Sequence, residues 1–253
     1  MQEYRVSNRS ARSLDRVVSS GAFKSPEDVL RHLINAYASE LIIHTAQGID
    51  LQPADGGAHR TQQQWIALYN AQEGEFKGKR MIASYDVIGA PSSASPKLLA
   101  SLQKDCVEYW IITSTHNSYQ RSTLAGNVIH NYQSTVVRPK IISLDEIPVL
   151  QGEPASKVVE MPGGLLYIRA LANDRHAKPA ALLNGLVALA QREPEDIFFH
   201  TPDQDSRNMD SERAVRFGDG GGGFHVGGGS RFVNGNGRSR GVFVSPRSGR
   251  AKK

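Results

Sequence analysis

The sequence predicts an α+β fold, in which a small N-terminal helical module precedes a mixed, mainly antiparallel body that ends in a glycine-rich region. Three observations lead to this prediction. Apolar residues recur at helical spacing between residues 10 and 41. Short strand-like runs alternate with two helix-like runs between residues 65 and 200. A glycine-rich window, residues 218–241, lies between two further strand-like runs.

The composition is that of a folded protein. Of 253 residues, 39% are hydrophobic and 22% are charged, which supplies a core and excludes a wholly disordered chain. No run of 18 apolar residues occurs, and the polar N-terminal residues lack the apolar segment of a secretory signal. The single cysteine, Cys106, excludes an intrachain disulfide and a thiolate metal cluster. We therefore expect a cytoplasmic protein that does not enter a membrane.

Residues 1–43 have the layout of a short strand followed by two helices. Residues 3–6 could form the strand and residues 10–19 the first helix. Ser25 and Pro26 then predict a helix start, because serine caps a helix and proline suits its first position. The apolar face of this second helix contains Val29, Leu30, Leu33, Ile34, Tyr37 and Leu41.

This layout resembles a ribbon-helix-helix module. The resemblance implies an intertwined dimer whose paired strands can enter the major groove of DNA, with Arg5 and Ser7 as DNA-binding residues. A plain helical hairpin used for dimerisation is the alternative. In either case we expect a homodimer or a higher homo-oligomer.

Residues 44–64 contain Gly, Pro, Asp and Gln with little periodicity and are expected to be a linker. Residues 65–150 are expected to form an α+β middle unit with an antiparallel sheet. Its elements are a short helix or strand beginning at Trp65, strands at 79–87, 108–114, 127–137 and 140–144, and a helix at 96–106.

A Gly/Pro break at residue 151 predicts a domain boundary. The elements predicted after it are a β-hairpin at 158–170, a helix at 179–192 and a strand at 196–200. The hairpin prediction depends on Pro162, Gly163 and Gly164, which lie between two apolar runs. The helix is the strongest in the chain and starts at Pro179.

Residue types that could carry catalysis do not combine into a recognisable site. No HExxH or CxxC spacing occurs, so neither a metal site nor a cofactor is predicted. Ser114, His116 and Asp105 could be drawn as a nucleophilic triad, but the GxSxG pattern is absent. Asp203 and Asp205 lack the third carboxylate of a metal-dependent nuclease. A hydrolase or nuclease is therefore the third choice of function.

Three further residues are assigned to the core. Cys106 lies on the apolar face of a predicted helix, so we expect a buried and unreactive thiol. Trp65 and Trp110 are expected to pack in the core rather than to stack on a ligand. No catalytic residue is assigned.

Glycine is concentrated near the C-terminus, where 11 of the 24 glycines lie between Gly218 and Gly241. Within this window Gly, Asp, Ser and Asn fill 16 of 24 positions. Phe224 and Val226 nevertheless have the spacing of a strand. We therefore expect exposed loops on a β scaffold, with a disordered linker as the alternative.

The run ERAVRF at residues 212–217 and the run GRSRGV at residues 237–242 resemble the end of a C-type-lectin-like domain of the formylglycine-generating-enzyme type. More narrowly, the layout resembles the variable proteins of diversity-generating retroelements. The resemblance implies a lectin-like region over residues 151–245 that displays ligand-contacting residues between fixed strands. The Gly-Gly-x-Trp motif is missing, and this region has no cysteine, which argues against the catalysis of the generating enzyme.

The resemblance divides the region into two classes of position. The implied scaffold positions are Arg213, Val215, Phe217, Phe224, Val226, Gly237, Arg240, Gly241 and Val242. The implied ligand-binding display positions are Asp219, Gly220, Gly221, Gly222, Gly223, His225, Gly227, Gly228, Gly229, Ser230, Arg231, Asn234 and Asn236. Composition supports the same interpretation, because A-to-G changes in an AAY asparagine codon yield Ser, Asp and Gly.

The charge is concentrated at the same end of the chain. The formal net charge is +5, yet residues 212–253 alone sum to +7, so the other residues sum to −2. The basic tail, residues 246–253, could attract nucleic acid. The leading prediction is a non-enzymatic protein that binds a protein or other macromolecule through a diversified C-terminal surface. The alternative is a DNA-binding regulator that uses the N-terminal module and the basic tail.

Overall fold

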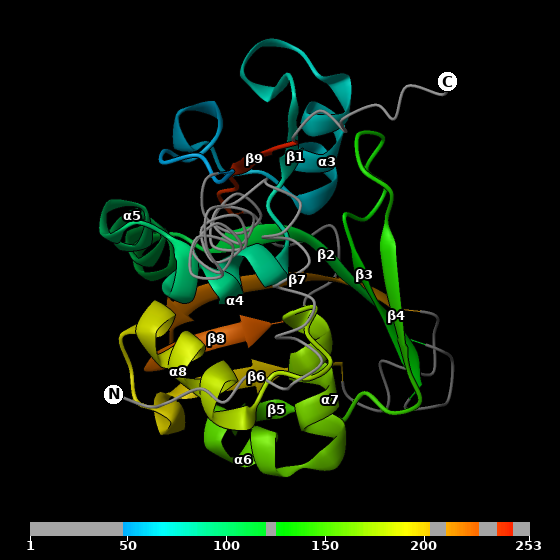
Figure 1. Ribbon diagram of the computed structural model, residues 1–253, viewed down its shortest axis with the longest axis vertical. Helices are drawn as coiled ribbons and strands as arrows, with labels where there is room; N and C mark the ends of the chain where they lie inside the picture. The colour runs from blue at the N-terminus through cyan, green and yellow to red at the C-terminus, as the bar shows by residue number, and fades with distance from the viewer. Residues whose placement is uncertain (1–47, 120–124, 203–210, 228–236, 245–253) are drawn as a thin grey trace, which may run out of the picture. The chain divides into compact units, whose positions relative to one another are not determined.

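Strands β2 and β7 lie at the centre of a seven-stranded sheet, whose strand order is β4-β3-β2-β7-β8-β6-β5 (Figure 1). Neighbouring strands are antiparallel, except that β6 and β8 are parallel. The strands are β2 (Ile111–Tyr119), β3 (Gly126–His130), β4 (Lys140–Leu144), β5 (Gln151–Pro154), β6 (Ile197–His200), β7 (Ser211–Gly220) and β8 (Gly223–Gly227). The predicted α+β class with a mainly antiparallel sheet is confirmed.

The computed structural model of the protein describes residues 48–119, 125–202, 211–227 and 237–244. The ribbon-helix-helix-like module, with Arg5 and Ser7, and the basic tail lie outside the described residues. Thr45–Lys253 forms one compact unit, and its sheet combines strands from both sides of the boundary predicted at residue 151. In the ranges described, no helix is long and apolar enough to cross a membrane.

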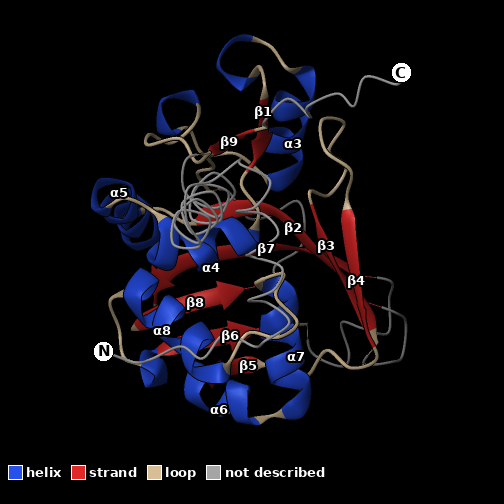
Figure 2. Ribbon diagram, viewed as in Figure 1, coloured by secondary structure: helices blue, strands red, loops and turns tan. Residues whose placement is uncertain are grey.

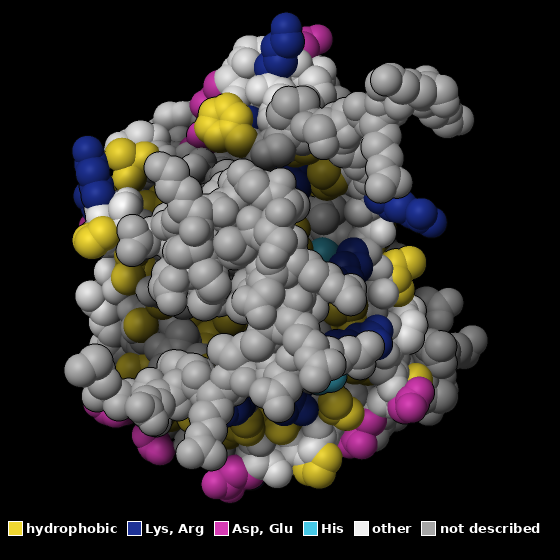
Figure 3. Space-filling view, viewed as in Figure 1, with side chains coloured by type: hydrophobic (Ala, Val, Ile, Leu, Met, Phe, Trp, Pro, Cys, Tyr) yellow, Lys and Arg dark blue, Asp and Glu magenta, His cyan; other side chains and the backbone are white. Residues whose placement is uncertain are grey.

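Five helices pack on one face of the sheet (Figures 1 and 2). They are α4 (Ser84–Ser93), α5 (Pro96–Glu108), α6 (Ala155–Glu160), α7 (Pro162–Leu171) and α8 (Pro179–Ala190). Leu102, Leu186 and Phe217 are fully buried in the core between these layers. On the outer surface of the helix side, Asp and Glu side chains gather along the lower edge of the view (Figure 3). Because side chains alternate along a strand, Arg216 faces away from the helices.

Helices α5 and α8 begin where the sequence predicts. The Ser95 hydroxyl accepts a hydrogen bond from the Leu98 backbone N–H, and Pro96 occupies the first position of α5. Pro179 has the same role in α8, which ends at Gln191 in a left-handed conformation with φ 53°. Both helices therefore begin with a proline at their first position, where its missing N–H is not needed.

The β-hairpin predicted at 158–170 is wrong, because the segment forms α6 and α7. Pro162 occupies the first position of α7, a role in which proline does not need its missing N–H. Gly164 is needed for a close approach rather than for a turn. A Cβ atom there would collide with the Val158 carbonyl oxygen.

The strand predicted at 79–87 is shorter than expected. It is β1 (Lys79–Met81), and the chain then enters α4. The Asp86 carboxylate accepts a hydrogen bond from the Ala83 backbone N–H at 2.7 Å, which fixes the start of that helix.

The strand predicted at 127–137 also ends early, at His130. Asn131 and Gln133 have positive φ angles of 53° and 50°, which extended strands do not adopt. This turn carries the chain from β3 towards β4.

A second, smaller layer contains β1, α3 (Gln62–Ala71) and β9 (Gly241–Phe243), and β1 pairs with β9. Its apolar cluster includes Trp65 of α3 and Ile112 of β2. Within the expected linker, Ile49 pairs with Val242 and Arg60 pairs with Gly237. Residues 48–64 are therefore not a linker, because they are hydrogen-bonded to the C-terminal end of the chain.

Candidate ligand-binding surface at the glycine-rich hairpin

The first part of the glycine-rich window folds as the β7–β8 hairpin. Gly220 pairs with Gly223 across the end of the hairpin, and Gly221 and Gly222 form the turn. Their φ angles are 57° and 104°, and two successive positive values are typical of a type I′ turn. The strands predicted within the window are confirmed up to Gly227.

One side of the hairpin is a buried scaffold. Val215, Phe217 and Phe224 are 0% exposed and Val226 is 1% exposed, all in the core beneath the helices. The remaining scaffold positions are also buried, and they are Arg213, Gly237, Arg240, Gly241 and Val242. The burial expected of these positions is confirmed, whereas the family that suggested them stays a prediction.

The hairpin tip lines a shallow cleft of about 520 Å³ on the helix side of the sheet. Its walls are Asp219, the three glycines that follow it, Arg192 and Val107. The Asp219 carboxylate pairs with the Arg192 guanidinium at 2.9 Å. A second cavity of about 610 Å³ on α5 shares Val107, which is 48% exposed. Together they line an open surface with two apolar side chains, Val107 and Ala100, among polar ones, which suits a macromolecular partner better than an enclosed small molecule.

The opposite face of the sheet carries an aromatic row made of Trp110, His225 and Phe198. Trp110, which precedes β2, stacks on His225 with ring centroids 6.0 Å apart. Phe198 of β6 lies 5.6 Å from His225. The Arg216 guanidinium carbon lies 4.5 Å from the centre of the Trp110 ring. All four side chains are half-buried.

Glycines make room for these rings. A Cβ atom at Gly218 would lie 2.6 Å from Cδ2 of Trp110, and one at Gly223 would collide with the Phe198 ring. Because glycine lacks that atom, each ring can lie against the backbone of the neighbouring strand. Part of the glycine content of the window therefore has a packing cause.

Two histidines are joined in one hydrogen-bonded chain across β6 and β8. His225 Nε2 donates to the Gly220 carbonyl oxygen, so its Nδ1 is the acceptor. His200 Nε2 then donates to that Nδ1 at 2.8 Å. Burial lowers the pKa of His200, and the neighbouring His225 lowers it further. Both effects favour the neutral form of the His200 imidazole.

The display positions divide into three groups. Asp219, Gly220, Gly221, Gly222 and His225 are partly or fully exposed, as expected of display positions. Gly223 and Gly227 are buried, and Gly223 has no room for a side chain, so its assignment to the display class is wrong. The other six positions, which lie between residues 228 and 236, are outside the described residues.

Strand β2 contains a run of buried polar residues beside a register shift between Ile112 and His116. Gln62 of α3 donates to the carbonyl oxygens of Thr113 and Thr115 at 2.6 and 2.9 Å. The side-chain oxygen of Gln62, Oε1, lies 3.2 Å from His116 Nδ1. Burial and the charge of Arg213 lower the pKa of His116 to about 4. These contacts satisfy backbone groups that the register shift leaves without a strand partner.

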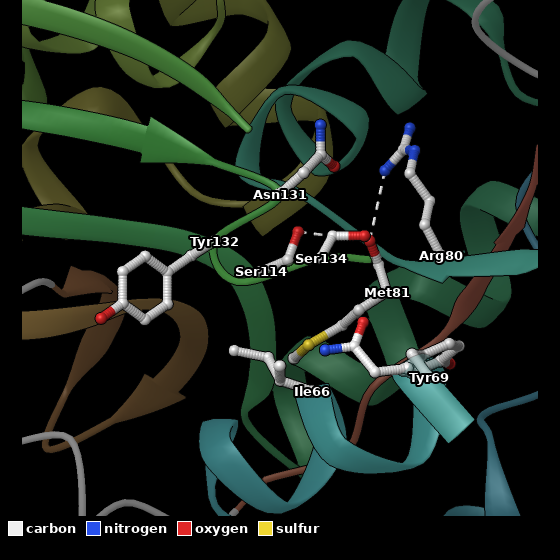
Figure 4. Close-up of a pocket in the computed structure, with 9 residues that line it drawn as sticks. Ile66, Tyr69, Arg80, Met81, Ser114, Asn131, Tyr132 and Ser134 are labelled. Atoms are coloured by element: carbon white, nitrogen blue, oxygen red, sulfur yellow. Dashed lines mark hydrogen bonds between the residues drawn. The ribbon is translucent and has the colours of Figure 1, made fainter. Parts of the chain in front are cut away.

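A small pocket lies between α3, β1, β2 and the turn after β3 (Figure 4). Its volume is about 210 Å³, and its enclosed part has room for about one water molecule. Arg80 and Ser114 both donate to the Met81 carbonyl oxygen at 3.2 Å (Figure 4). The Tyr69 hydroxyl and Asn131 Oδ1 are buried and have no hydrogen-bond partner among the described residues. The pocket is polar but too small, as it stands, for an organic substrate.

The structure does not assemble the catalytic triad drawn from the sequence. Ser114 donates to the Met81 carbonyl oxygen, His116 contacts Gln62, and Asp105 binds Arg240. Among the described residues, no group of three or more His, Cys, Asp or Glu side chains is placed to hold a metal ion. Asp203 and Asp205 lie outside those residues.

The expected burial of Cys106 is confirmed, and burial raises the pKa of its thiol well above the ordinary value. Trp65 is 0% exposed, as expected of a core residue. Trp110 is not, because it belongs to the aromatic row.

The sequence does not indicate most of this surface, including Trp110, Phe198, His200 and Arg216. One signal was available, since alternation along β7 and β8 places Arg216 and His225 on the face opposite the apolar residues. Nothing in the sequence brings Trp110 to a hairpin about 100 residues away. Comparison of the chain with protein-family models, with curated proteins and with solved structures gave no match.

Proposed function

We propose that this chain is a non-enzymatic binding protein that presents a variable surface at its glycine-rich hairpin, as the variable proteins of diversity-generating retroelements do. One observation carries the proposal. The hairpin has a fully buried scaffold on one side. The residues of its tip and of the aromatic row are exposed or half-buried. Side-chain changes at the tip can therefore alter recognition without changing the core.

The shape of the tip favours recognition of a protein or other macromolecule. The cleft is shallow, and Asp219 and Arg192 offer a carboxylate and a guanidinium side by side. Exposed glycine backbone at Gly221 and Gly222 adds further donors and acceptors.

The chemistry of the turn suits diversification from an asparagine codon. Gly221 and Gly222 have positive φ, which Gly, Asn and Asp adopt more readily than other residues. These are three of the four residue types that an AAY codon and its A-to-G variants encode. The remaining display positions of the proposal are Gly220, Gly227, Gly228, Gly229, Ser230, Arg231, Asn234 and Asn236.

Resequencing the locus in a clonal population tests the proposal. We expect variants to differ at Asp219, Gly221, Gly222 and His225, and to keep Phe217, Phe224, Val226 and Arg240. The Gly, Asp, Ser and Asn codons of the window should read RRY, with a near-copy carrying AAY close by. An invariant locus whose glycine codons end in purines, with no nearby copy, would exclude diversification.

A further inference from the structure

The outer face of β6, β8 and β7 has a composition of its own. Alternation along the strands gives this face Phe198, His200, His225 and Arg216, with glycines between them. Among residues 197–200, 213–220 and 223–227 of these strands, no acidic side chain occupies a position on this face. Asp219 faces the helix side, where it pairs with Arg192. Glu153 of the edge strand β5 is an acidic residue whose charge acts on His200 and raises its pKa.

The rings on this face are arranged as a platform. Trp110, His225 and Phe198 follow one another at 6.0 and 5.6 Å, and the planar guanidinium of Arg216 lies over Trp110. Gly218 lets Trp110 approach the backbone of β7. The result is a succession of flat π surfaces beside a cation, and none of these groups carries a negative charge.

We propose that this face binds single-stranded nucleic acid, with bases stacked on the aromatic row and the backbone phosphates near Arg216. Aromatic side chains on a sheet accept bases of any sequence, because every base has a π face. A duplex keeps these faces stacked inside, so a single strand is favoured. The charge is complementary, since residues 212–253 carry a formal charge of +7. The proposal goes beyond the proposed function and does not need the tip to be diversified.

The experiment measures anisotropy of a labelled twelve-nucleotide oligo(dT) with the full chain, over a range of salt concentrations. Trp110→Ala should weaken binding about 5- to 100-fold at every salt concentration, because stacking is lost while the charges remain. The slope of affinity against salt should stay the same. Arg216→Ala should weaken binding and reduce that slope by about one charge. Arg175→Ala, an exposed arginine between α7 and α8 on the helix side, is its matched control and should have little effect.

A pair of hairpin variants keeps the test independent of damage to the fold. Gly220→Asp places a carboxylate on the aromatic face, where a Cβ atom meets Trp110 only at an ordinary 3.5 Å. Gly221→Asp adds the same charge at the turn, where no atom lies within 4 Å of the Cβ position and aspartate accepts positive φ. We expect the first change to weaken binding at least tenfold more than the second.

Three outcomes would overturn the proposal. The first is no binding at low salt. The second is binding that disappears with residues 246–253 and ignores both Trp110→Ala and Gly220→Asp, since the tail alone would then be responsible. The third is equal affinity for duplex and single strand. None of these outcomes affects the resequencing result, so the two proposals fail separately.

Discussion

Trp110 lies against strand β7 because Gly218 has no side chain. The same strand offers a contrast two residues on, where a Cβ atom at Gly220 would meet Trp110 at 3.5 Å instead of 2.6 Å. Glycine therefore occupies these two positions of one face for different reasons. Gly218 is required by packing, whereas Gly220 is free to change.

Gly218→Ala should lower the free energy of unfolding by about 1–3 kcal/mol, because the Trp110 ring must move. Gly220→Ala is the matched control and should change it by less than about 1 kcal/mol. Urea unfolding followed by circular dichroism measures both. Adding Trp110→Ala to the first variant should recover part of the loss. Equal effects at the two glycines would contradict this account.

Arg240 also contacts residues that are far away in the sequence. It is 0% exposed, and Asp105 receives hydrogen bonds from both Arg240 and Arg238. Arg240 also donates to the carbonyl oxygens of Asp50, Leu51 and Ser101. One guanidinium thus joins α5, the residues before α3 and the C-terminal strand.

Asp105→Asn should destabilise the protein by about 3–5 kcal/mol, because it leaves a buried guanidinium without its charge partner. Glu108→Gln is the control, since it removes the exposed partner of Lys104 on the same helix and should cost less than about 1 kcal/mol. Thermal melts of both variants give the comparison. A loss of similar size in the two would show that the buried pair has no special role.

At the scale of elements, the sequence predicts what depends on local signals. Helices α5 and α8 are confirmed because proline marks both starts and serine also caps α5. The strands predicted at 140–144 and 196–200 are confirmed because their apolar runs are short and bounded. The failures have a common cause. Gly164 lies next to a proline and between apolar runs, which predicts a turn, but it permits contact with Val158, a tertiary effect that local sequence does not contain. The aromatic row was missed for the same reason, because strand order brings its members together.

The buried polar residues of β2 and β3 make stability depend on pH. His130 Nε2 donates to the Ala170 carbonyl oxygen at 2.9 Å, and its Nδ1 lies 3.0 Å from the Thr115 hydroxyl. Burial lowers the pKa of His130 to about 4. The unfolded chain, with an ordinary histidine, binds a proton below about pH 6.5. Between these values the unfolded state holds more protons, so stability falls as the pH falls.

We expect His130 to account for a loss of about 3 kcal/mol between pH 7 and pH 4, and His116, with a similar pKa, for a comparable loss. Urea unfolding at a series of pH values measures it. His130→Gln should be less stable at pH 7 but should depend less steeply on pH. His176→Gln, at an exposed position, should retain the steepness of the natural chain. An unchanged slope in His130→Gln would contradict the assignment.

At the scale of the whole molecule, Thr45–Lys253 forms its own compact unit. The sequence nevertheless predicts amphipathic helices in residues 1–43, and a two-helix piece cannot bury an apolar face alone. We therefore propose that these residues make the chain a homodimer or a higher oligomer.

Light scattering after size exclusion should give an oligomeric mass for the full chain and a monomeric mass for a chain shortened to residues 45–253. Circular dichroism should show that the shortened chain stays folded, because Thr45–Lys253 forms a compact unit of its own. Leu33→Asp in the full chain should also give a monomer. Two species of equal, monomeric size would exclude this role for the N-terminal module.

The central pair of the sheet imposes an order on synthesis. Ile111 of β2 pairs with Phe217 of β7, and the residues before α3 pair with residues 237–242, near the end of the chain. A ribosome adding about 5–20 residues per second needs roughly 5–20 s to pass from β2 to β7. During that time β2 can pair with its hairpin partner β3 on one edge. Its neighbour on the other edge, β7, has not yet been synthesised. The two sheets cannot be completed until β7 and β9 have been synthesised. The rate of translation, and any factor that shields the unfinished sheets, therefore limit folding in the cell.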